Sequence, residues 1–528
     1  MKRNFKKALS LMLCLIMTVA VMAPAAVAGN NPYPIVYLEG YGGALYVEDG
    51  NTSSEQIYPT GTDVGGTIKE AILPCLKELA NGFVTDNYDK YADALYNAAA
   101  PIWKDLVLNK DGTAKDGSGD SFVNGALIPK TYSSELSGYR FSYDWRLSPY
   151  DIADELKFNI DNLMDATGKD KVNLVGRCLG GNMITAYLTK YTDHAKAHVD
   201  SVMLYVTSSN GIKVLDSLFT GEIVLDENNI ERFADYLFNN KVIISDPDLK
   251  SLVDTLVPFL NEIKVLGLGM DALQFIVDKV KDNLIPRLGL ACYVGFPSFW
   301  SMMSAEKYPQ AKAYIFRDGR EVEYAGMIEK LDAYYENVQL KMDETFDTLE
   351  DAGVKIGVIA KYNVPSLPLY AEADEQADFF TGVTNASLGA TAAPLDKTLS
   401  DSYINSLADK KYVSPDKKID ASTCRFPDTT WFVKNIVHDD FPDSLHNFIA
   451  KFINSNGTMT VFTDTVNYPQ YLDYNAEDGS VTPIVGTDPE VPENGSSEKR
   501  FSVFIRFFTA IMNFFTKLFS GDFENLFG

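Results

Sequence analysis

The stretch KVNLVGRCLGGNM, residues 171–183, decides the fold of this protein. It begins with an apolar run, Val172–Val175, which predicts a short buried strand. Glycines lie on both sides of Cys178, and a helix-like segment, Gly181–Lys190, follows. A strand, a tight glycine turn and a helix in this order would present the side chain of Cys178 at the start of the helix.

Cys178 therefore stands where a nucleophile is often found. The pattern Gly176-x-Cys178-x-Gly180 is similar to the G-x-S-x-G nucleophile elbow of the α/β-hydrolases, with cysteine in place of serine. The start of a helix favours the thiolate, which is the reactive form of a thiol. Polyhydroxyalkanoate synthases, which act inside cells, have a similar G-x-C-x-G-G elbow and use its cysteine. The alternatives are an inactivated elbow and a small core residue in a turn.

A second glycine-rich turn, Glu39–Gly43, follows the apolar run Ile35–Leu38. In α/β-hydrolases such a turn supplies one backbone N–H of the oxyanion hole, and the residue after the nucleophile supplies the other. The sequence therefore predicts the N–H groups of Tyr41 and Leu179 as the two donors. The alternative is an ordinary turn between a strand and a loop.

A third motif, YDWRLSP, occupies residues 143–149. Asp144 and Arg146 have opposite charges, and we expect them to pair and to brace the elbow from behind. Pro149 stands where a helix readily begins.

Together these motifs resemble the lecithin:cholesterol acyltransferase family of α/β-hydrolases. The resemblance rests on Leu38–Gly43, Tyr143–Arg146 and Gly176–Gly181. It extends to Pro297–Trp300, which is similar to a Pro-Ser-x-Trp segment in that family's cap. It covers roughly residues 33–455, strongly at the motifs and loosely between them. It implies acyl transfer or ester hydrolysis on a lipid. That family normally has serine at the elbow, and Cys178 departs from this.

The wider pattern predicts an α/β-hydrolase fold, with a mostly parallel sheet, helices on both faces and a large helical cap. Short apolar runs alternate with helix-like segments. Two intervals, about 44–138 and 211–353, are too long for plain connections and are expected to be cap insertions. The second has helix-like patterns at 249–266 and 325–349. The expected strands are Ile35–Leu38, Tyr139–Tyr143, Val172–Val175, Ser201–Val206, Lys355–Ala360 and Thr430–Lys434, and the expected helices are Ser148–Leu163, Gly181–Lys190 and Ser444–Ile453.

The histidine of a triad should follow the last strand of the sheet, in the order nucleophile, acid, histidine. His194 and His198 come too early in the chain. His446 lies among apolar residues and is expected on a helix face. His438 lies in the loop before that helix and is the predicted catalytic histidine.

The acid should lie just beyond the strand Lys355–Ala360. The residues leave four candidates in this region, which are Glu372, Asp374, Glu375 and Asp378. The resemblance favours Asp378, because related sequences place the acid shortly before a segment like Ala386–Ala390. Phe379 follows it in place of the glycine of the usual Asp-Gly step. The acid would orient the imidazole and stabilise its protonated form.

The two ends of the chain predict separate segments. Residues 1–28 have the basic start, apolar run and small-residue cleavage site of a secretory signal peptide, with a membrane anchor as the alternative. The catalytic domain is expected at 29–476 and a polar linker at 477–498. Residues 499–528 predict an amphipathic helix that contacts a membrane surface or a partner. Docking on the protein's own core or spanning a membrane are the alternatives.

The composition of the chain limits the kinds of partner and cofactor that we expect it to bind. The formal charge of −25 makes nucleic acid and anionic lipid poor candidates for electrostatic capture. The cysteines outside the leader are far apart and predict neither a disulfide framework nor a metal site. No metal or nucleotide motif is present, so no cofactor is expected.

These features predict a secreted or cell-surface enzyme that uses Cys178, Asp378 and His438. It would act on a lipid or other acyl ester through a covalent thioester. A catalytically silent surface-binding protein that uses the cap as a groove is one alternative. A thioesterase or peptidase-like hydrolase with the same site is another.

Overall fold

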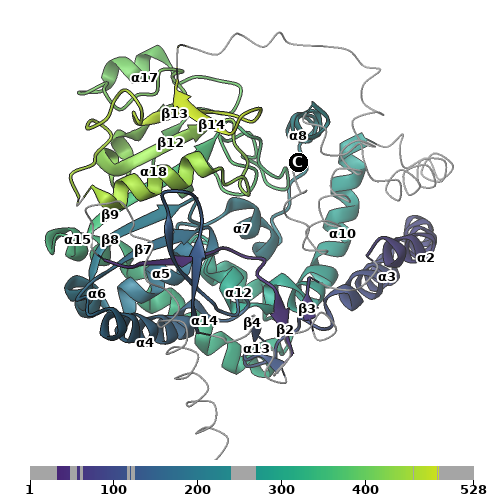
Figure 1. Ribbon diagram of the computed structural model, residues 1–528. Helices are drawn as coiled ribbons and strands as arrows, with labels where there is room; N and C mark the ends of the chain where they lie inside the picture. The colour runs from purple at the N-terminus through teal and green to yellow at the C-terminus, as the bar shows by residue number, and fades with distance from the viewer. Residues whose placement is uncertain are drawn as a thin grey trace, which may run out of the picture.

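The computed structural model describes residues 33–47, 56–59, 64–115, 119–120, 125–239, 269–455, 457–484 and 486. Its centre is a sheet of nine strands in the order β14-β13-β12-β9-β8-β7-β1-β6-β5 (Figure 1). The strands from β13 to β6 pair in parallel, and β14 and β5 add antiparallel edges. The strands are β1 Ile35–Leu38, β5 Leu127–Thr131, β6 Ser137–Phe141, β7 Val172–Arg177, β8 Val199–Tyr205, β9 Lys355–Tyr362, β12 Thr430–Lys434, β13 Tyr471–Asn475 and β14 Ser480–Pro483.

Helices cover both faces of this sheet. Alternate side chains of a strand point to opposite faces, so each strand contributes to a core on both sides. In β1, Val36 and Leu38 join one core cluster, whereas Ile35 and Tyr37 join the other. The first face carries α4 Pro149–Thr167, α5 Leu179–Lys190, α6 Thr192–His198 and α15 Met342–Asp351. The second carries α18 Asp443–Asn454, whose apolar residues are buried in the other cluster. The predicted fold class, a mostly parallel sheet between helices, is confirmed.

The elements of the two long insertions, which follow the carboxyl ends of β1 and β8, are together called the cap. Helices α2, α3 and α10 pack together as an arm that extends away from the sheet (Figure 1). The first insertion holds β2 Leu45–Tyr46, β3 Gln56–Tyr58, α2 Val64–Thr85, α3 Asp89–Ala99, η1 Ala100–Trp103 and β4 Gly119–Asp120. The second holds α7 Lys213–Thr220, α8 Glu227–Asn239, α10 Gly269–Leu290, η4 Tyr293–Gly295, α11 Pro297–Trp300, α12 Tyr308–Ile315, α13 Arg320–Glu323, α14 Ala325–Asn337 and η5 Gln339–Lys341.

A smaller set of elements lies between β9 and β12. These are α16 Val383–Ala386, β10 Thr391–Ala392, α17 Asp401–Ser406, β11 Ile419–Asp420, η6 Ala421–Thr423 and η7 Pro427–Thr429. Strands β10 and β11 pair as a separate antiparallel ribbon.

Several segment boundaries in the structure differ from those expected from the sequence. Strand β5 lies inside the interval 44–138, so the first insertion ends before residue 127. Helix α15 lies inside 211–353 but packs on α5, α6 and β9, so the second insertion ends before it. Strand β14 lies inside the expected linker, which begins no earlier than residue 484. The expected signal peptide, the helix-like pattern at 249–266 and the C-terminal helix lie outside the described residues. Within the described part of the chain, no helix is both long enough and apolar enough to cross a membrane.

Candidate active site

The elbow joins β7 to α5 and holds Cys178 in a rare backbone conformation, with φ 50° and ψ −124°. Such a conformation is costly for a residue with a side chain, and it is found chiefly at functional sites. The flanking glycines are needed for close approach. A Cβ on Gly176 would lie 2.7 Å from the Cα of Gly181, and one on Gly180 would overlap the carbonyl oxygen of Leu38. The elbow therefore turns sharply against β1.

His438 lies in the loop between β12 and α18, and its side chain is almost wholly buried. Its Nδ1 lies 2.8 Å from Oδ2 of Asp378, and its main-chain N–H donates to the Asp378 carbonyl at 2.8 Å. The Cys178 sulfur is close enough to the imidazole to act on its pKa. Burial alone would lower the pKa of His438, but the Asp378 carboxylate and the Cys178 sulfur together raise it well above 6.5. The three predicted residues are thus brought together.

Asp378 lies in the loop after β9 and is fully buried. Its second oxygen, Oδ1, accepts the main-chain N–H groups of Phe380 and Thr381 at 3.1 and 2.7 Å. Phe379, which follows Asp378, has φ 93°, a left-handed conformation that favours glycine. Its ring packs on Phe233. The turn that an Asp-Gly step would make is therefore made by phenylalanine.

The other acidic and histidine candidates lie elsewhere. Glu375 hydrogen-bonds to Tyr370 and pairs with Lys213, and His438 is paired with neither Glu372 nor Asp374. His446 is buried in α18 beside two tyrosine rings, and burial lowers its pKa to about 4. It lies on a helix face, as expected.

The expected oxyanion loop lies directly beside the elbow. A Cβ on Gly40 would lie 2.9 Å from the Cβ of Cys178. Leu179 is the first residue of α5, where main-chain N–H groups have no partner within the helix. Tyr41 packs its ring against Trp145, and its hydroxyl joins those of Tyr58 and Tyr293 in a buried chain. The two expected donor residues therefore lie at the elbow, Leu179 as the residue after Cys178 and Tyr41 as a lining residue of the same cavity.

The YDWR motif holds this loop. The Tyr143 hydroxyl donates to the Glu39 carbonyl, and Trp145 Nε1 donates to the Gly43 carbonyl at 2.8 Å. Asp144 and Arg146 form the expected pair at 2.7 Å, buried from solvent. Arg146 also donates to the carbonyl of Leu106 in the first insertion, so the pair joins the YDWR motif to the cap.

A cavity of about 140 Å³ opens at Cys178 and His438. Helix α7 forms one wall, and the cap segments around Tyr293 and Phe299 form another. The lining is mostly apolar, and its charged residues are Arg177 and Asp439. The remaining lining residues are Gly40, Tyr41, Ile212, Val214, Leu215, Leu218, Met302, Leu367, Leu369 and Phe380. A cavity of this kind fits an apolar chain whose polar end reaches the sulfur.

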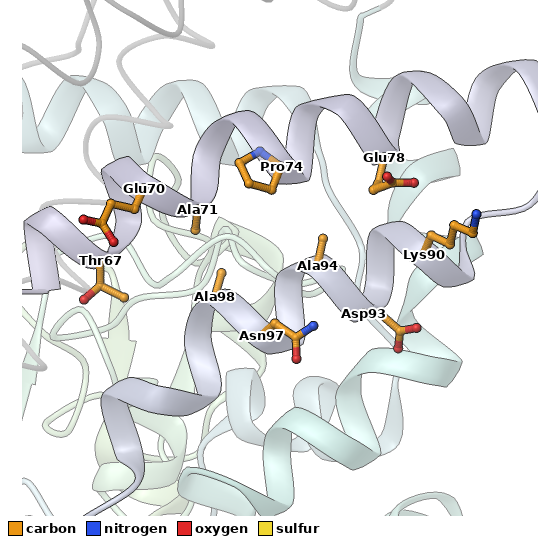
Figure 2. A pocket seen from close by; sticks show the side chains of 10 residues that line it. All are labelled: Thr67, Glu70, Ala71, Pro74, Glu78, Lys90, Asp93, Ala94, Asn97 and Ala98. Carbon is orange, nitrogen blue, oxygen red and sulfur yellow. The ribbon is translucent and has the colours of Figure 1, made fainter.

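A larger and more open hollow of about 530 Å³ lies between α2 and α3 (Figure 2). Figure 2 shows small side chains such as Ala71, Ala94 and Ala98 on its walls, with carboxylates such as Glu78 and Asp93 around them. None of the residues that line it belongs to the cluster at Cys178. Among the described residues, no group of three or more histidine, cysteine or acidic side chains is placed to hold a metal ion.

Two positively charged residues at the site, Arg177 and Lys361, were not predicted from the sequence. Arg177 stacks on the ring of Phe441 at 3.8 Å, and Lys361 reaches the loop of His438. The available signal for Lys361 was a charged residue that extends the apolar run of β9. Asn182, in the elbow helix, donates to Ser301 after the Pro-Ser-x-Trp segment, which ties the cap to the elbow.

Comparison with known proteins agrees with this geometry. Residues 131–237 match a sequence family described as alpha/beta hydrolase fold, and the match spans β6, the elbow and β8. No curated protein and no solved structure shows a significant match to the chain. The match and the nine-stranded sheet show an α/β-hydrolase fold, a class made up mostly of hydrolytic enzymes.

Proposed function

We propose that the protein is a secreted or cell-surface acyltransferase or lipase-like enzyme with Cys178 as its nucleophile. One observation carries the proposal: His438, hydrogen-bonded to Asp378, and Cys178 line the same end of an apolar cavity, and the sulfur acts on the imidazole. The cavity favours a lipid acyl ester over a polar substrate. The elbow conformation and the tight glycine packing support a working nucleophile rather than a space-filling cysteine.

The reaction proceeds in two halves. The Cys178 thiol passes its proton to His438 as the sulfur attacks the acyl carbonyl carbon, and the N–H groups of Tyr41 and Leu179 stabilise the oxyanion. The ester C–O bond then breaks, and His438 gives that proton to the departing alcohol, which leaves an acyl thioester on Cys178. In the second half, His438 takes a proton from an incoming alcohol or water as its oxygen attacks the thioester carbonyl. The C–S bond then breaks, and His438 returns the proton to the sulfur, which restores the thiol. Asp378 keeps the imidazole oriented throughout.

A mass measurement tests the proposal. The mature protein is incubated with 4-nitrophenyl esters of increasing chain length, quenched in acid and digested. We expect an acyl adduct on the peptide that contains Cys178, and faster release of nitrophenol with longer apolar chains. Cys178→Ala should lose the adduct and the turnover. Cys75→Ala, which removes a half-buried cysteine in α2, should keep both.

The outcome also separates the alternatives. An adduct that is discharged to added alcohol indicates transfer, whereas one discharged only to water indicates hydrolysis. A wild-type protein that never acquires an adduct, with Cys178 no more reactive than a free thiol, would indicate the silent binding protein.

A further inference from the structure

Lys361, near the end of β9, sends its side chain into the loop that carries His438. The side chain is fully buried. Its Nζ donates to the carbonyl groups of Val437, His438 and Asp440 at 2.9, 2.9 and 2.6 Å. An ammonium group has three N–H donors and no acceptor, so its hydrogen-bonding capacity matches these three carbonyls one to one.

The surroundings of Lys361 come from several elements. The rings of Tyr205, at the end of β8, and Phe441, in the histidine loop, lie 5.1 and 4.3 Å from Nζ. The charged groups that act on it are Asp378, Asp440, Asp439 and Arg177, and its three hydrogen bonds all go to main-chain carbonyls. Burial of an ammonium group costs free energy. The three hydrogen bonds to the histidine loop explain why such a group is present here.

We propose that Lys361 is the positioning residue of the catalytic histidine: its ammonium fixes main-chain residues 437–440 so that the imidazole of His438 lies between Asp378 and Cys178. The inference rests on the proposed function, because it assigns a role within that triad. The same loop is held from the other side, where Arg177, next to the nucleophile, stacks on Phe441. This contact keeps the position of the histidine loop fixed relative to the nucleophile.

The charge of Lys361 makes this positioning depend on pH. Burial lowers the pKa of Lys361 to about 7, with Arg177 acting in the same direction and Asp378, Asp440 and Asp439 against it. Above that pH the group becomes a neutral amine with two N–H donors for three carbonyls. Positioning therefore weakens as pH rises through about 7. Stability changes in the opposite sense. The folded pKa lies below the unfolded value of about 10.4, so the cost of burying the charge is relieved between about pH 7 and 10.4.

Two variants separate positioning from mere burial of a charge. Lys361→Met removes the donors and keeps the apolar stem. Lys434→Met is the matched control, because Lys434 is also buried, lies on the neighbouring strand β12, and pairs with Asp416. For folded Lys361→Met we expect kcat at pH 6.5 to fall by about 10- to 100-fold with KM within about twofold, since small misplacements of catalytic groups cost about that much. The fall in kcat near pH 7 should also disappear. Lys434→Met should keep the wild-type profile.

Lys361→Arg supplies the second variant if Lys361→Met does not fold. Its guanidinium stays charged, so the fall near pH 7 should be lost here too. A folded Lys361 variant with the kcat and pH profile of Lys434→Met would overturn the proposal. So would a wild-type Lys361 Nζ that titrates, by NMR, far from the fall in kcat.

An NMR measurement that needs no turnover distinguishes the positioning role of Lys361 from the proposed function. The ¹⁵N shifts and the pKa of the His438 imidazole should change in Lys361→Met or Lys361→Arg and stay near wild-type values in Lys434→Met. If the wild type forms no acyl-enzyme but His438 moves in this way, the proposed function fails and the positioning role stands. If the wild type is active but His438 does not move, the positioning role fails alone.

Discussion

The thiols of the described residues lie in different environments. Burial raises the pKa of Cys75, and it raises the pKa of Cys292 and of Cys424 to about 12. Cys178 instead stands at the start of α5 with the His438 imidazole beside it. We expect iodoacetamide to alkylate Cys178 faster than the other three near pH 7, because the thiolate is the reacting form. His438→Ala should slow this reaction and leave the others unchanged. Peptide mass mapping over time measures all four rates, and equal rates would contradict the prediction.

Asp378 controls the state of the histidine. Asp378→Asn should lower kcat by about 10⁴-fold, as in serine triads where the amide favours the wrong tautomer. His446→Ala, a change in α18 away from the triad, should keep most of the activity of the folded enzyme. Comparison of kcat for the two variants on one soluble ester measures the contrast. Full activity in Asp378→Asn would rule out its assigned role.

The same substitution predicts a pH effect on stability. The folded pKa of His438 lies above its unfolded value of about 6.5, so the stability from its charged form is fully present below that pH. It is lost as pH rises through the folded pKa. The stability gap between the wild type and Asp378→Asn in urea unfolding should therefore be wider at pH 6 than at pH 10. A gap that widens with pH would contradict this.

The sequence pointed to the proposed catalytic residues more easily than to the residues that support them. Cys178 and His438 follow from motif and chain order alone. Asp378 needed the family resemblance to separate it from nearby acids. The conformation of Phe379 gave no sequence signal, because glycine is the residue that such a turn normally uses. It is made possible by burial of the ring against Phe233, which is a tertiary contact.

At the scale of elements, the buried centre of the sheet was predictable and its edges were not. β1 and β12 coincide with the expected Ile35–Leu38 and Thr430–Lys434. Both strands are buried along their whole length, and both have an apolar run, which fills β1 and forms the centre of β12. β5 and β14 are half-exposed edge strands with polar residues and proline, so they lack that signal. The helix-like pattern at 325–349 divides into α14, η5 and α15 because the chain turns after Val338.

The elbow is an element whose packing can be tested by adding one methyl group. Gly180→Ala would force a Cβ onto the Leu38 carbonyl and to within 2.7 Å of the Glu39 carbonyl oxygen. Gly168→Ala, after α4, is strained by a left-handed φ of 65°, but no atom lies within 4 Å of the new Cβ. It should cost about 1–2 kcal/mol, the usual strain of this conformation. We expect Gly180→Ala to cost clearly more and to abolish turnover. Thermal unfolding of both variants measures the difference, and equal losses would contradict the packing.

At the scale of the whole molecule, the sheet, the cap and the cavity form a unit whose last described strand is β14. This strand pairs with β13 and ends at Pro483, so the sheet needs the chain up to that residue. For residues 499–528, which lie outside the described residues, the sequence predicts an apolar helix with a narrow polar stripe that includes Arg506 and Lys517. Such a segment exposes more apolar surface than a free-standing soluble helix tolerates.

We therefore expect truncation after Asp488 to remove a surface tether and nothing else. The truncated protein keeps every strand of the sheet and every residue placed at the site, so its melting temperature and its turnover of a soluble ester should stay near those of the full chain. Its co-sedimentation with lipid vesicles, and its activity on esters held in them, should fall. The full chain with Arg506→Glu and Lys517→Glu is the matched control. It keeps the apolar face and should lose binding to anionic vesicles more than to neutral ones. A truncated protein that unfolds or aggregates would show that the segment packs on the core.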